Sequence, residues 1–288
     1  MKKLSLIRTL LVRELPFLFS LPALAWLLVF LGMPLAITFY FSFFGDSGFS
    51  LGYYKQLFDL VHVRVIMRSL LLGLSTSLVC LLFAYPVAYF LAIKAGRWKN
   101  ILIALLMVPL WTNFLIQVYG WFFLVERNGL INLLLLKLGI VAEPLALANN
   151  LGAVFVVMVY CYLPFMIMPL YTILEKFDVR LLEASADLGA SVWKTFFTVT
   201  LPLTVSGIRT GVLLTFVLGF GEFAIPALVG GGKYMMVGSL IYYYFLVVHD
   251  NSLGAAFTCM SSFVLLMVSL LAYKYLGKWC VHDKVVEL

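Results

Sequence analysis

The chain has little charge for its length. Of its 288 residues, 11% are Asp, Glu, Lys or Arg and 64% are hydrophobic, whereas a soluble domain carries about 25% charged residues. So few charges cannot cover an exterior that faces water. The formal net charge of +7 does not indicate nucleic-acid binding, because the basic residues flank long apolar runs and do not line one face of a domain. The composition predicts a membrane protein with the bilayer as its solvent.

Cysteine and histidine are also scarce. The four cysteines form no CxxC pair and no disulfide framework. His62, His249 and His282 lie far apart, and none has a Cys, Asp or Glu at metal-ligand spacing in a shared apolar run. The sequence therefore predicts no metal site. A membrane enzyme is disfavoured as well, because it needs a cluster of catalytic groups.

Long apolar runs are what the chain does have. Six are long enough to cross a bilayer as helices, and two shorter ones predict interfacial or re-entrant helices. The six are Phe17–Phe44, Ile66–Ile93, Ile101–Val125, Leu151–Leu174, Gly207–Val229 and Leu253–Leu276; the two are Leu130–Val141 and Met235–Val248. The first run is too long for a cleaved signal peptide. We expect an all-α membrane protein with a transmembrane domain at 17–276, between tails at 1–16 and 277–288.

The distribution of basic residues predicts the orientation. Most of the 20 Lys and Arg residues fall in the two tails and in the second and fourth connections between spans. Cytoplasmic segments retain such residues. Both termini are therefore expected in the cytoplasm, which agrees with an even number of spans.

The fourth connection, Glu175–Ser206, is longer than a simple helix bundle requires. Asp178 can cap a short helix, Gly189 can end it, and Leu201-Pro202 can begin another. Periodicity alone leaves open a helix that lies on the lipid headgroups.

The residues themselves resemble the EAA signature of bacterial ABC-importer permeases. The match is Glu183-Ala184-Ser185, three residues, Gly189, nine residues, Val199, one residue and Leu201-Pro202, with Ser185 and Val199 as departures. The resemblance implies a six-span, type I (MetI-like) permease fold with its core at 66–276 and a coupling loop at 175–206. In that family the loop contacts the ATPase. The residues carried over to this contact are Glu183, Ala184, Asp187, Leu188 and Gly189.

The same resemblance implies the partners. They are a second permease subunit, two cytoplasmic ATPase subunits and an extracytoplasmic substrate-binding protein, assembled in a bacterial inner membrane. The chain has no GxxxxGK[ST] phosphate loop. ATP and Mg are therefore expected in the partner ATPase, and no cofactor is expected on this chain.

Four other segments resemble spermidine/putrescine permeases. They are Val108–Asn113, Leu163–Tyr171, Leu174–Asp178 and Gly221–Pro226. Permeases for ferric ion, thiosulfate and molybdate share the EAA loop, so these substrates stay open as alternatives. A secondary transporter is a further alternative, but it predicts internal repeats and several intramembrane ionisable residues, which the sequence does not show.

Glu222 is the acidic residue placed well inside a predicted span. Charge there is costly, so a functional role is the first hypothesis, and Gly219, Gly221 and Pro226 favour local unwinding beside it. We expect Glu222 to meet a cationic substrate. The alternative is a hydrogen bond that holds two helices together. Further candidates for polar and cation–π contacts are Trp111, Asn113, Gln117, Tyr119, Tyr160 and Tyr162. Their alternative role is packing and anchoring at the membrane interface.

Overall fold

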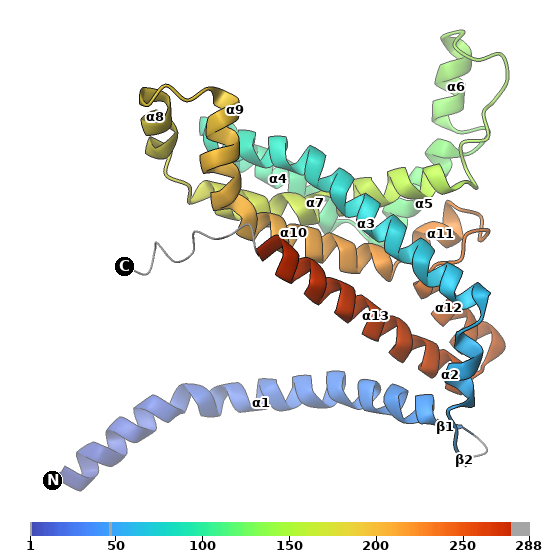
Figure 1. The fold of residues 1–288 in the computed structure, drawn as a ribbon, viewed down its shortest axis with the longest axis horizontal. Helices are drawn as coiled ribbons and strands as arrows, with labels where there is room; N and C mark the ends of the chain where they lie inside the picture. The colour runs from blue at the N-terminus through green and yellow to red at the C-terminus, as the bar shows by residue number, and fades with distance from the viewer. Residues whose placement is uncertain (1, 46–47, 278–288) are drawn as a thin grey trace.

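The computed structural model describes residues 2–45 and 48–277, which are mostly helical (Figure 1). The helices are α1 (Lys2–Phe43), α2 (Gly52–Leu57), α3 (Leu60–Tyr89), α4 (Lys99–Trp111), α5 (Phe114–Val125), α6 (Leu130–Lys137), α7 (Leu151–Glu175), α8 (Arg180–Asp187), α9 (Val192–Thr195), α10 (Leu201–Phe220), α11 (Ala224–Leu228), α12 (Val237–Tyr242) and α13 (Asn251–Gly277). Wider π-type turns extend three helices at Phe90–Lys94, Phe196–Thr200 and Tyr243–Val248, and a 3₁₀ turn spans Gly96–Trp98. Strands β1 (Phe44–Gly45) and β2 (Gly48–Phe49) form a short antiparallel pair.

Helices α3, α7 and α10 pack together and form the centre of the bundle. Their backbones come close because glycines lie at the contacts. A Cβ atom on Gly219 would lie 3.2 Å from the Cα of Gly73, and one on Gly211 would lie 2.6 Å from the Sδ of Met166. Small residues allow such approaches between membrane helices, where dispersion contacts replace the hydrophobic effect as the driving force.

The number of spans agrees with the sequence prediction. Five helices in the described part of the chain are long and apolar enough to cross a membrane, and a bent pair raises the number to six. Helices α3, α7 and α13 correspond to the predicted second, fourth and sixth spans.

The predicted third span, Ile101–Val125, is not one continuous helix. It breaks after α4, and the segments on the two sides of the break are bent by 91°. Asn113 has an extended backbone, and its side chain accepts hydrogen bonds from the N–H groups of Leu115 at 2.9 Å and Ile116 at 3.3 Å. Asn113 is therefore the N-cap that starts α5. Hydropathy cannot detect such a cap inside an apolar run.

The predicted fifth span, Gly207–Val229, is displaced toward the N-terminus. Its helix runs from Val192 to Phe220 and stops at Gly221, and α11 is a separate short helix. The sequence predicted that a helix begins at Leu201-Pro202, but the helix is continuous through this position. It can continue because the π-type turn at Phe196–Thr200 precedes the proline. Proline lacks an N–H group and its ring crowds the preceding turn, and wider turns accommodate both effects. Much of the predicted coupling loop at 175–206 is thus part of this helix.

The two ends of the bundle carry different elements. Helices α8 and α9 and the starts of α1 and α4 lie at one end, and α2, α6, α11, α12 and the β1–β2 pair lie at the other (Figure 1). This arrangement fits the predicted topology. The side of the membrane that each end faces stays a prediction.

The glycine contacts make a stability prediction. Gly219→Leu should lower the free energy of unfolding by about 1–3 kcal/mol, because the new side chain must push α3 away from α10. Gly120→Leu on α5 is the control, since a Cβ atom there would meet no atom within 4 Å. Thermal unfolding of the purified protein in detergent measures both effects. An equal change in the two variants would contradict the packing described here.

Candidate functional site

Helix α8 ends where the sequence indicates but begins one residue later than predicted, with Val179 as its N-cap. The Asp178 carboxylate accepts a hydrogen bond from the N–H of Arg180 at 3.0 Å. At the other end, the N–H of Gly189 donates to the carbonyl of Ala186 at 2.8 Å, and the N–H of Ala190 donates to that of Ser185 at 3.1 Å. These two bonds form a Schellman motif. Helix α8 is thus a short unit with defined ends.

Gly189 is required at this helix end for its backbone conformation. Its φ is +76°, and a Cβ atom there would meet no atom within 4 Å. The conformation is strained for most residues with a side chain. A side chain at position 189 is therefore disfavoured by the backbone conformation and not by contacts with the rest of this chain.

One face of α8 contacts the rest of the molecule. The hydroxyls of Ser185 on α8 and Thr195 on α9 are hydrogen-bonded at 2.9 Å. A cavity of about 630 Å³ separates α8 from α3, with Leu182 on one side and Tyr85 and Tyr89 on the other. The Ser185 contact connects α8 directly to the helix that continues to Phe220.

The other face of α8 and the turn after it are exposed. Glu183, Ala184, Asp187, Leu188 and Gly189 all have exposed positions. Leu188 is 89% exposed, and two further apolar residues, Val192 and Trp193, are 85% and 73% exposed. Exposed apolar side chains at the end of a bundle are typical of a surface for another protein or for the membrane. Sequence reasoning missed Val192 and Trp193 because the signature does not include them; both also line the cavity beside Leu182.

Glu222 lies in the break between α10 and α11. It is only 7% exposed. Its Oε1 accepts hydrogen bonds from the N–H groups of Phe223 at 2.9 Å, Ala224 at 2.7 Å and Ile225 at 3.2 Å. Its Oε2 accepts a hydrogen bond from the Tyr162 hydroxyl on α7. The predicted unwinding is present, and the side chain fixes its geometry.

The other predicted contact residues lie in two settings. Asn113 caps α5, and the Gln117 amide donates to the Pro109 carbonyl and to the Thr112 hydroxyl, so both residues stabilise the α4–α5 break. The exposed side chains are Trp111 at 75%, Tyr119 at 47% and Tyr160 at 41%. Helix α5 contacts α11, so the two broken regions adjoin. Of the predicted set, Tyr162 contacts Glu222.

Comparison with known proteins identifies the family. The spermidine/putrescine transport system permease protein PotB of Escherichia coli (strain K12) is 38% identical over 255 residues, which cover 86% of this chain and 92% of PotB. PotB of Haemophilus influenzae is 34% identical over 271 residues, covering 92% of this chain and 94% of that protein. The chain belongs to the ABC-importer permease family that includes PotB. No family model matches the chain.

Solved structures show the same fold. The permease is similar to a chain of a bacterial alginate ABC transporter, crystallised in complex with an alginate pentasaccharide-bound periplasmic protein, with a TM-score of 0.76. That match has 17% sequence identity and covers 94% of the permease and 97% of the other chain. A chain of the MetNI methionine ABC transporter matches with a TM-score of 0.56 at 15% identity, over 77% of the permease and 99% of that chain. The type I importer fold predicted from the sequence is confirmed, and the protein is a transport subunit.

The contacts of Glu222 predict the order in which three substitutions lower the free energy of unfolding. Glu222→Ala should lower the free energy of unfolding by about 1–3 kcal/mol, because buried N–H groups lose their acceptor. Tyr162→Phe should have a smaller effect, since it removes one donor. Glu222→Gln should be close to wild type, because its oxygen can accept from the backbone while its amide donates to Tyr162. Thermal unfolding in detergent gives the order, and a Gln variant as unstable as the Ala variant would refute it.

Proposed function

We propose that the permease carries polyamines of the spermidine/putrescine class into the cytoplasm, driven by ATP hydrolysis in a partner subunit. The observation that carries this proposal is the identity of 38% to PotB over 86% of the chain. The charge distribution agrees with it, since most Lys and Arg residues lie near the ends of the spans. Arg209 lies inside the Val192–Phe220 helix, where it stacks on the Tyr273 ring.

The ATPase binds at α8 in this proposal. Leu188, Val192 and Trp193 supply apolar contact area, and Glu183 and Asp187 supply charge beside it. Gly189 lets the helix end in a tight turn, so that the tip of the loop is narrow enough to enter a groove. This end of the bundle then faces the cytoplasm, with the N-terminus on the same side.

The helix from Val192 to Phe220 transmits the motion. Its 29 residues span about 44 Å at 1.5 Å per residue. One end is bound to α8 through Thr195 and Ser185, and the other end leads into the Glu222 break. A displacement of α8 by the ATPase therefore reaches the opposite end of the bundle through one continuous element.

Glu222 is the proposed contact for a substrate ammonium group. In the described conformation its carboxylate is occupied by backbone N–H groups and by Tyr162. A cation can reach it only when α11 moves, so substrate and helix start compete for the same oxygens. Such competition makes the attraction weak enough for release. An extracytoplasmic binding protein delivers the substrate at this end, and a second permease subunit completes the path.

Uptake by the complete importer tests the substrate class. Proteoliposomes that contain the complex and its binding protein should accumulate labelled putrescine or spermidine only with ATP, and excess molybdate or thiosulfate should not compete. Gly189→Val should abolish uptake because of its strained φ, whereas Gly189→Asn should retain most of it, since Asn tolerates positive φ.

Competition by an oxyanion would contradict the polyamine assignment. Uptake driven by an ion gradient without ATP would overturn the importer mechanism itself. Normal coupling in the Gly189→Val variant would remove the α8 turn from the ATPase contact.

A further inference from the structure

Helix α4 is loosely packed against the rest of the bundle. None of its 13 residues is buried. A cavity of about 340 Å³ is lined by Leu102 and Leu106 of α4 on one side, and by α3 and the π-type turn after it on the other. A second cavity, of about 410 Å³, lies between Leu110 of α4 and helices α7 and α10. Close packing is what holds membrane helices together, so a helix with gaps on two sides can shift against its neighbours.

Polar contacts at the start of α4 join it to α7. The Lys99 Nζ lies 2.8 Å from the Glu175 Oε1, which makes an ion pair. The same ammonium group lies 5.4 Å from the centroid of the Tyr171 ring, within the range of a cation–π contact. Tyr171 is only 7% exposed and belongs to the hydrophobic core. The start of α4 is therefore attached to a well-packed part of α7.

Glu175 has a particular place in the chain. It is the last residue of α7, and the loop that carries α8 begins directly after it. On its other side, α8 is joined to α9 by the Ser185–Thr195 hydrogen bond. A displacement of α8 is therefore applied to the bundle at Glu175 as well as at α9.

The far end of α4 leads to the second broken region. The helix spans about 20 Å at 1.5 Å per residue and ends at the 91° bend before α5. Helix α5 contacts α11, whose first N–H groups donate to the Glu222 carboxylate. A shift of Lys99 would thus be carried along α4 to the Asn113 break and the helices around it.

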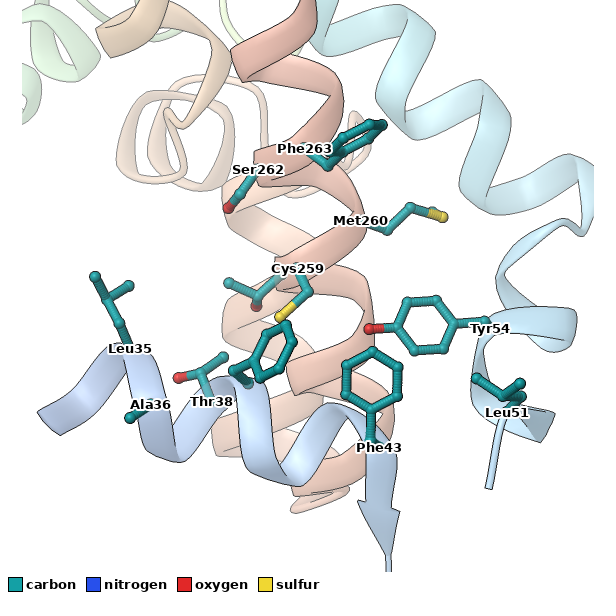
Figure 2. A pocket seen from close by; sticks show the side chains of 12 residues that line it. Leu35, Ala36, Thr38, Phe43, Leu51, Tyr54, Cys259, Met260, Ser262 and Phe263 are labelled. Carbon is teal, nitrogen blue, oxygen red and sulfur yellow. The ribbon is translucent and has the colours of Figure 1, made fainter. Parts of the chain in front are cut away.

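Helix α1 is also peripheral, and its hydrogen bond to the bundle provides a contrast. A cavity of about 830 Å³ separates α1 from α13. The Tyr54 hydroxyl, which points toward Cys259 of α13 (Figure 2), donates a hydrogen bond to the Ser42 hydroxyl of α1 at 3.1 Å. Ser42 is near the C-terminal end of α1, at the end of the bundle opposite α8 (Figure 1). This hydrogen bond is remote from α8, whereas the ion pair of α4 adjoins the α8 loop.

We propose that Lys99 and Glu175 are a positioning pair for coupling, which makes α4 move with the base of the α8 loop. This inference rests on the proposed contact between α8 and the ATPase. A displacement of the loop then reaches the opposite end of the bundle by two routes, one through Val192–Phe220 and one through α4. The side chains of Lys99 and Glu175 are 26% and 45% exposed, and exposed ion pairs contribute little to folding stability. Loss of the pair should therefore change the position of α4 and leave the fold intact.

The number of putrescine molecules taken up per ATP hydrolysed, in the reconstituted importer with its binding protein, tests the pair. Lys99→Gln and Glu175→Gln should each lower this ratio about fivefold, the low end of coupling between sites, while ATP hydrolysis continues. The double variant Lys99→Glu with Glu175→Lys should restore most of the ratio, because it forms the pair in reverse. The matched control is Lys176→Gln, since Lys176 is an exposed neighbour that forms no ion pair within the described residues.

Thermal unfolding of the same variants in detergent separates positioning from folding. Each variant should unfold close to the wild-type temperature, for the reason given above. A wild-type ratio in both Gln variants would overturn the proposal. A ratio that falls only together with the unfolding temperature would also overturn it, as would a double variant that restores nothing. Putrescine uptake by the wild-type importer without ATP would overturn the proposed function itself, and the positioning pair with it.

Discussion

The hydrogen bonds of the Glu222 carboxylate hold together the place where α7, α10 and α11 meet. A helix that breaks in or near a membrane leaves N–H groups without partners, and each buried one is costly. Glu222 accepts from three of them and from Tyr162. Asn113 does the same for the start of α5. These two caps allow the chain to bend within apolar segments, and α5 can then pack against α11.

In the proposed coupling, the position of the Glu222 break gives the fifth span its mechanical role. The span connects two specialised ends, with the Ser185–Thr195 bond at one and the Glu222 break at the other. Close glycine contacts with α3 and α7 keep it in the centre of the bundle. In this proposal a force applied to α8 is carried by a packed element, while α1 contacts the bundle mainly toward its C-terminal end.

The sequence predicted the number of spans, the C-terminal end of α8 and the family, because long apolar runs and the EAA spacing are strong local signals. It placed the third and fifth spans incorrectly. Asn113 and Glu222 start helices inside apolar sequence, and hydropathy averages over such residues. The role of Tyr162 as the partner of Glu222 depends on contact between α7 and the end of α10, which no local pattern contains. The exposure of Val192 and Trp193 likewise depends on how α8 lies against α9.

The contact between α8 and the ATPase is the central claim, and site-specific photo-crosslinking tests it most directly. A photoreactive residue at Leu188, which is 89% exposed on the α8 turn, should crosslink to the ATPase subunit in the assembled importer. The same residue at Leu138, which is 71% exposed just after α6 at the opposite end, should not. A crosslink to the ATPase from Leu138 and none from Leu188 would contradict both the contact and the orientation of the permease.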